Sequence, residues 1–224
     1  MAFEGTGDLA DPRVVRQTLR DLITAGVQGI VWSGGGEPTT HPEWLEIVQE
    51  AARLGLSQGM YTCGGLLTPA TGAALARVAA WVVVSLDAAD GDTYAREKRV
   101  PEDRWRQACD GVRALTGQSA TVGVSYLLTG ENWTQAPVMV ALSRRLGATY
   151  TTFRPAVQVD ARAPGVVLGD RAWVDEAQGL LHALATRNDV ELDIARFASY
   201  AGWQGHGYTS CTGPRYNTTI TPDG

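Results

Sequence analysis

Cysteine is scarce in this chain, which has only three in 224 residues, at positions 63, 109 and 211. Three scattered cysteines exclude a disulfide scaffold, so we expect a reducing, cytoplasmic environment. Long apolar runs are also missing: the longest, residues 78–84, is far shorter than the ~18 residues that a membrane span needs. The sequence therefore predicts no membrane partner.

Positive charge is not in excess either. Lysine and arginine total 19 against 24 acidic residues, which gives a net charge of −5 and no electrostatic reason to expect nucleic acid as a partner. Hydrophobic residues make up 44% of the chain and charged residues 19%, so a sizeable core can form. The length favours one large domain.

Apolar strand patterns alternate with helical patterns along the chain. Strands are predicted at 29–32, 57–62, 81–86, 120–127, 150–154 and 190–194, and helices at about 12–25, 44–54, 69–77, 102–115, 134–146 and 170–187. This alternation predicts βα units and a parallel sheet. Periodicity does not separate an open sheet from a barrel, but in both the function lies at the carboxyl ends of the strands.

The loop Ser33–Pro38 has the most unusual composition of any strand end. Three consecutive glycines allow a ligand to approach the backbone closely, and Glu37 can accept hydrogen bonds from an ammonium group. The alternative is a tight turn with a solvated acid. The loop is neither a G-x-G-x-x-G fingerprint nor a P-loop, because no Gly-Lys-Ser/Thr follows.

Residues 31–42, VWSGGGEPTTHP, resemble the "GGE" segment of radical S-adenosylmethionine (radical SAM) enzymes. Later strand ends fit the same family in order: residues 61–64, the S-x-D at 85–87, residues 123–132 and residues 153–155. The resemblance implies an α/β fold, a partial (β/α)6 TIM-like barrel without its first strand. It implies a core domain over residues 1–205 and the start of an extension over 206–224.

The resemblance also implies a cofactor site for S-adenosylmethionine (SAM). Gly35, Gly36 and Glu37 would bind the amino group of its methionyl part. Ser85 and Asp87 would contact the carboxylate or the ribose, although Asp87 could equally be a strand-end cap. Arg154 would contact the carboxylate end or the substrate. No catalytic acid or base is identified.

The family's Cys-x3-Cys-x2-Cys motif does not occur in this sequence. We therefore expect a truncated piece of a longer protein, which alone assembles no [4Fe–4S] cluster and makes no 5′-deoxyadenosine. In the parent, the resemblance implies such a cluster, a 5′-deoxyadenosyl radical that abstracts hydrogen from an unknown substrate, and an electron donor such as flavodoxin or ferredoxin. An in-frame cysteine motif upstream of Met1 would separate truncation from a natural start.

The last residues predict a hairpin, because a strand-like stretch runs into Pro222-Asp223-Gly224. With Cys211 before it, this stretch resembles the opening of the auxiliary-cluster (SPASM or twitch) extension of radical SAM enzymes. Cys211 would then be an iron–sulfur ligand, and the parent would continue with further cysteines. The alternative is an ordinary loop cysteine.

Two other interpretations of the whole chain stay open. It could be a cluster-free domain that binds SAM or a nucleotide without radical chemistry. It could also be a nucleotide-dependent enzyme with an open sheet, which strand order would decide. Among single residues, Cys63 is expected to line a pocket rather than react, and Cys109 is expected in the core.

Overall fold

The computed structural model describes residues 9–34, 36–156, 158–159, 166–167, 172–187, 191–193 and 219–220. Its centre is a parallel sheet of six strands in the order β1-β2-β3-β4-β5-β8. The strands are β1 (Gly29–Trp32), β2 (Ser57–Thr62), β3 (Trp81–Ser85), β4 (Thr121–Leu128), β5 (Tyr150–Pro155) and β8 (Glu191–Asp193). Among the described residues β1 and β8 do not pair, so the sheet is an open part of a barrel.

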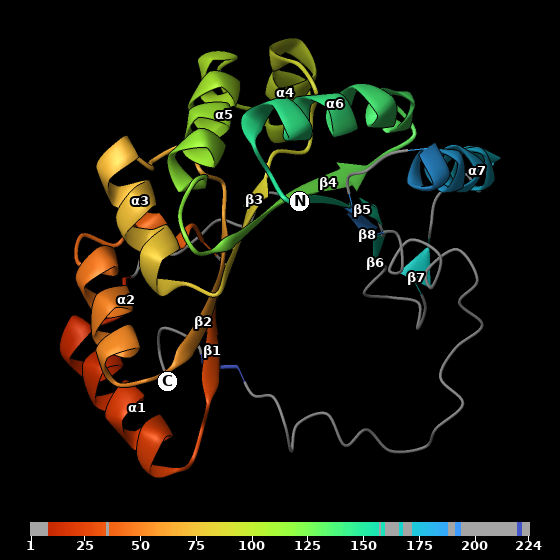
Figure 1. The fold of residues 1–224 in the computed structure, drawn as a ribbon. Helices are drawn as coiled ribbons and strands as arrows, with labels where there is room; N and C mark the ends of the chain where they lie inside the picture. The colour runs from red at the N-terminus through yellow and green to blue at the C-terminus, as the bar shows by residue number, and fades with distance from the viewer. Residues whose placement is uncertain are drawn as a thin grey trace, which may run out of the picture.

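Helices follow the strands and lie along the convex face of the sheet (Figure 1). They are α1 (Pro12–Thr24), α2 (Trp44–Arg53), α3 (Pro69–Val78), α4 (Gly91–Lys98), α5 (Asp103–Leu115), α6 (Ala136–Leu146) and α7 (Ala172–Arg187). Local signals set their ends: the Asp11 side chain accepts from the Arg13 N–H at the start of α1, and Gly147 ends α6 with φ +85°. None of the described helices is long and apolar enough to cross a bilayer.

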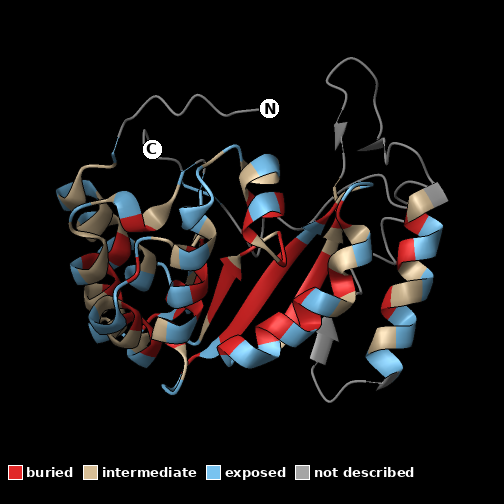
Figure 2. Cartoon of the chain, turned by 90° about the horizontal axis from the view of Figure 1, so that it is seen from above, coloured by how far each residue is buried: buried red, intermediate tan, exposed pale blue. Residues whose placement is uncertain are grey.

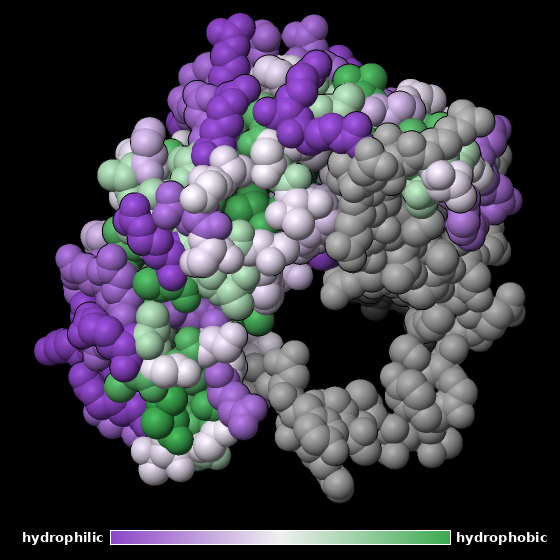
Figure 3. All heavy atoms as spheres, in the orientation of Figure 1, coloured by the Kyte–Doolittle hydropathy of each residue, from purple (hydrophilic) through white to green (hydrophobic). Residues whose placement is uncertain are grey.

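The core lies between the convex face of the sheet and these helices. Figure 2 shows buried residues along the central strands and on the inward sides of the helices, and exposed residues on their outward sides. Alternate residues of β3 and β4, including Val82, Val84, Val122 and Val124, are at most 2% exposed. Burial of each such side chain contributes about 1.5–3 kcal/mol. Hydrophilic residues cover the outer helical surfaces (Figure 3).

The sequence predicted this arrangement with two omissions. The six parallel strands and the helices on the convex face confirm an incomplete α/β barrel. The prediction missed α4, which is short and highly charged, so that it has little apolar periodicity. It also placed only a long loop after β5, where the structure has a small antiparallel pair, β6 (Gln158–Val159) and β7 (Val166–Val167).

Candidate functional site

Glu37 follows β1, and hydrogen bonds from two strand ends fix its carboxylate. Thr39, in the short 3-10 helix Pro38–Thr40, donates its N–H (3.2 Å) and its hydroxyl (2.6 Å) to Oε1. At the end of β2 the Thr62 hydroxyl donates to Oε1 (2.6 Å), and the Cys63 N–H donates to Oε2 (2.6 Å). The carboxylate therefore has a set position before any ligand arrives.

This environment keeps Glu37 ionised. Burial acts to raise its pKa, but the hydrogen bonds from Thr39, Thr62 and Cys63 outweigh burial and lower the pKa below the usual 4.5. Oε2 accepts the Cys63 N–H, and the Cys63 thiol adds a weak hydrogen bond to the same carboxylate. Because a thiol is a weak donor, a ligand ammonium can take its place at the carboxylate.

The glycines beside Glu37 leave open space. A Cβ added at Gly36 would meet no atom within 4 Å, and one added at Gly34 would meet only the Gly36 nitrogen, at 3.9 Å. Gly35 lies outside the described residues. The open loop and the fixed carboxylate together form a place where a cationic group can approach an anion closely.

Cys63 is next to this carboxylate, but its environment does not activate it. Burial and the nearby Glu37 charge raise the pKa of the thiol, and Lys98 opposes them only in part. The thiol therefore stays protonated at neutral pH, which argues against a reactive cysteine.

Asp87, just beyond β3, has its carboxylate engaged on both sides. Its Oδ1 accepts the Leu127 N–H of β4 (2.8 Å), and its Oδ2 forms an ion pair with Lys98 at the end of α4. The backbone of Asp87 is left-handed, with φ +46°, a conformation that costs a non-glycine residue free energy. Asp87 thus caps the neighbouring strand, while Ser85 ends β3 beside Ser125 in the register.

Lys98→Met is expected to lower the free energy of unfolding by about 1 kcal/mol, because it leaves the Asp87 carboxylate without its cation. The side chains of Lys98 and Asp87 are only 31% and 13% exposed, so salt screens the pair incompletely. Urea unfolding measures the change, and Lys98→Arg is the matched variant that retains the charge. Equal stability of Lys98→Met and the wild type would contradict an energetic role for the pair.

Tyr94, in α4, is influenced by the residues of these strand ends. Burial raises the pKa of Tyr94 to about 12, and Cys63, Asp87 and Glu37 add to the effect. Glu37, Cys63, Ser85 and Asp87, which end or follow β1, β2 and β3, are called the rim below.

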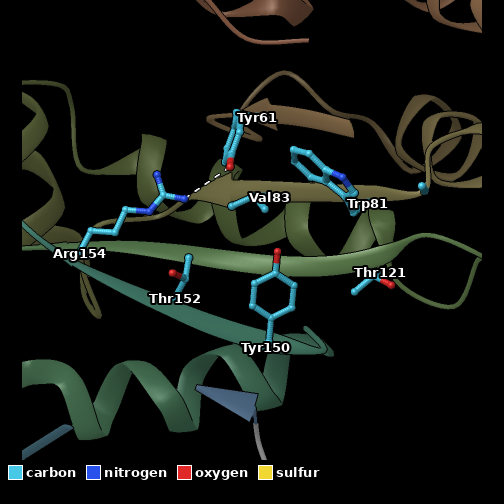
Figure 4. Close-up of a pocket in the computed structure, with 8 residues that line it drawn as sticks. Tyr61, Trp81, Val83, Thr121, Tyr150, Thr152 and Arg154 are labelled. Atoms are coloured by element: carbon cyan, nitrogen blue, oxygen red, sulfur yellow. Dashed lines mark hydrogen bonds between the residues drawn. The ribbon is translucent and has the colours of Figure 1, made fainter. Parts of the chain in front are cut away.

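The concave face of the sheet carries an open cavity of about 360 Å³ (Figure 4). Its walls include Tyr61 of β2, Trp81 and Val83 of β3, and Tyr150 and Arg154 of β5. Arg154 contacts Tyr61: its Nη2 is 3.5 Å from the phenol oxygen, and its guanidinium carbon is 5.6 Å from the ring centroid.

Two glycines make room for the aromatic rings in this cavity. A Cβ at Gly59 would lie 2.0 Å from the Trp81 indole, and one at Gly123 would lie 2.4 Å from the Tyr150 ring. Each ring therefore lies over the glycine of a neighbouring strand. Glycine inside a strand can indicate such close approach, and this signal could have identified the cavity from the sequence.

The other residues of interest from the sequence either have a structural role or lie outside the described residues. Cys109 is 3% exposed in the core, as expected. His41 serves the start of α2, where its Nδ1 accepts the Glu43 N–H (3.0 Å). Cys211 and nearly all of residues 206–224 are outside the part that the structure describes. Within that part, no group of three His, Cys, Asp or Glu residues could hold a metal ion.

Comparison with known proteins agrees with this geometry. The sequence profile of the Radical SAM superfamily matches residues 2–142. No curated protein matches the sequence.

Solved structures share the fold at low identity. SuiB of Streptococcus suis has a TM-score of 0.66 and 16% identity, over 84% of this chain and 43% of SuiB. Archaeal TYW1 has a TM-score of 0.56 and 18% identity, over 83% of this chain and 66% of TYW1. Native anSMEcpe, crystallised with AdoMet and the Cp18Cys peptide, has a TM-score of 0.61 and 11% identity, over 83% of this chain and 56% of that one.

The chain belongs to the radical SAM superfamily, because the family profile covers more than half of its length and includes the Glu37 loop and the first four strands. It spans less than half the length of the SuiB chains that it matches.

Proposed function

We propose that this chain is the SAM-binding part of a radical SAM iron–sulfur enzyme. The observation that carries the proposal is the Glu37 carboxylate, ionised and fixed by Thr39, Thr62 and Cys63 beside the open glycine loop. In this role Glu37 accepts a hydrogen bond from the amino group of SAM at Oε2, and Gly35 and Gly36 are assigned to the same group by the family resemblance. A charge-assisted hydrogen bond of this kind is stronger than a neutral one.

The other residues of the rim complete the proposed site. Ser85 can donate its hydroxyl to the carboxylate of SAM, and Asp87 can accept from a ribose hydroxyl at a lone pair that neither Leu127 nor Lys98 uses. Because Asp87 is already fixed by these two partners, its acceptor positions are set in advance. Arg154 lines the cavity on the concave face of the sheet. We therefore assign Arg154 to the substrate rather than to SAM.

The iron–sulfur cluster needs ligands that the described residues do not supply. When a reduced cluster and SAM are both bound, this family's chemistry supplies a 5′-deoxyadenosyl radical that abstracts hydrogen from a substrate. In this proposal the whole protein works in the cytoplasm and supplies the cluster ligands. Its electron donor is a flavodoxin or ferredoxin, and Cys211 is a ligand of an auxiliary cluster.

Calorimetric titration of the chain with SAM tests the proposal. SAM is expected to bind with a stoichiometry of one, and 5′-methylthioadenosine, which lacks both the amino group and the carboxylate, at least 10-fold more weakly. The main reason is loss of the charge-assisted bond to Glu37, which contributes about 1.5–3 kcal/mol, and loss of the Ser85 contact adds to it. S-adenosylhomocysteine, which keeps the amino group, is the matched control. Equal affinity for SAM and 5′-methylthioadenosine would remove Glu37 from the proposed site.

A further inference from the structure

The contact between Arg154 and Tyr61 spans the concave face of the sheet. Strands β3 and β4 lie between β2, which carries Tyr61, and β5, which carries Arg154. Neighbouring strands are about 4.8 Å apart, so the two strands would be separated by about 14 Å in a flat sheet. The 3.5 Å distance from Nη2 to the phenol oxygen shows that the curved sheet and the long arginine side chain bring the two groups together (Figure 4).

The guanidinium of Arg154 has few partners there. Its Nε is buried without a hydrogen-bond partner, and no salt bridge to Arg154 occurs among the described residues. Arg154 is the one charged residue of the eight that line the cavity. A guanidinium has five N–H donors, and among the described residues only the Tyr61 hydroxyl accepts from one of them. The described lining of the cavity thus carries one positive charge, inside a chain whose net charge is −5.

Three of the seven other lining residues are aromatic, and the remaining four are Ala80, Val83, Thr121 and Thr152. The indole of Trp81 and the ring of Tyr150 lie over Gly59 and Gly123, and Tyr61 contacts Trp81 edge to face at 5.1 Å. A volume of about 360 Å³ is near the lower end for small-molecule sites. Such walls bury a planar apolar group well, and the guanidinium can bind a carboxylate through two parallel hydrogen bonds.

We propose that Arg154 and Tyr61 bind the carboxylate of the substrate, and that the planar apolar part of the same molecule lies against Trp81 and Tyr150. The proposal rests on the proposed function only in calling this ligand the substrate. Arg154 supplies charge and two donors, and Tyr61 holds the guanidinium by its ring and its hydroxyl. The substrate class is thus an aromatic carboxylic acid.

Titration with three small probes, followed by NMR of the chain, tests this site. Benzoate is expected to bind saturably, benzamide at least 10-fold more weakly because it lacks the charge, and inorganic phosphate more weakly because it lacks the ring. Arg154→Gln should weaken benzoate binding at least 10-fold and Tyr61→Phe about 3-fold. The exposed Arg104→Gln is the matched control, with no change expected. Absence of benzoate binding to the wild type, or tighter binding of phosphate, would overturn the proposal.

Thermal unfolding without ligand gives a second, independent measure. Arg154→Gln is not expected to lower the Tm, because the described residues give the guanidinium no salt-bridge partner. A clear loss of Tm would show that Arg154 serves a structural ion pair, and the proposal would fail.

SAM itself carries a carboxylate, so the cofactor must be distinguished from the substrate. Arg154→Gln should bind SAM and decarboxylated SAM with the same ratio of affinities as the wild type. Selective loss of SAM affinity would assign Arg154 to the cofactor and overturn the substrate assignment. Benzoate binding without any SAM binding would instead contradict only the proposed function, so the two failures are distinguishable.

Discussion

Replacement of Glu37 by alanine is expected to weaken SAM binding about 30-fold, a loss of about 2 kcal/mol. The carboxylate supplies the proposed bond to the amino group of SAM, and four donated hydrogen bonds hold it in position. Glu37→Gln should have a similar effect, because the NH₂ group of the glutamine amide is itself a donor. It would face one of the N–H or O–H groups that donate to the carboxylate in the wild type. Calorimetry with SAM measures both variants. The control is Glu46→Gln, whose side chain is 71% exposed on α2.

The same substitution is expected to change how stability depends on pH. The folded state lowers the pKa of Glu37 below 4.5, so the ionised carboxylate stabilises the folded state. This contribution to the free energy of unfolding is complete above about pH 4.5 and disappears as the pH falls through the lowered pKa. Glu37→Ala should therefore lose less stability than the wild type on acidification from pH 5 to pH 3. Urea unfolding across this range measures the difference. Parallel pH curves for the two proteins would show that Glu37 is not stabilised as described.

Gly111→Ala is expected to destabilise the fold by about 3 kcal/mol, at the upper end of the usual cost of overpacking. Gly111 lies in α5, and a Cβ there would be 2.1 Å from the Gly64 carbonyl oxygen. The contact is with backbone, which cannot rotate away as a side chain could. Urea unfolding measures the effect. Gly179→Ala is the matched control: it lies in α7 with nothing within 4 Å, and should stabilise by about 0.5–1 kcal/mol.

Gly111→Ala should also weaken SAM binding in the molecules that remain folded. Gly64 donates its N–H to the Thr62 hydroxyl (3.0 Å), and Thr62 donates to Glu37. A shift of Gly64 therefore moves Thr62 and Cys63, which both donate hydrogen bonds to the Glu37 carboxylate. Unchanged SAM affinity in folded Gly111→Ala would show that the helix contact and the site are independent.

Much of the fold could be predicted from the sequence because its strands are continuous apolar runs. The predicted bounds of β1 and β2 are those observed, and the other strands of the main sheet differ by one or two residues. The helix α4 was missed because Asp90 and Thr93 form its cap without any apolar repeat behind them. Its start, Asp-Gly-Asp-Thr, was the available signal.

The candidate site could be predicted less completely. The composition of the loop identified Glu37, but its partners Thr62 and Cys63 are 25 and 26 residues away, and only strand pairing brings them to it. Lys98 was missed together with its helix. The contact of Arg154 with Tyr61 joins positions 93 residues apart and depends on the curvature of the sheet, which no local pattern encodes.

The main sheet has its strands in the order in which they occur in the chain. A chain leaving the ribosome therefore completes each new strand next to one that is already in place. Each strand can pair with the strand synthesised before it, without the last strand of the sheet. Each pairing closes a loop of similar length, so the entropy cost of each step is similar and moderate. The fold can thus form progressively during synthesis, from β1 towards β8.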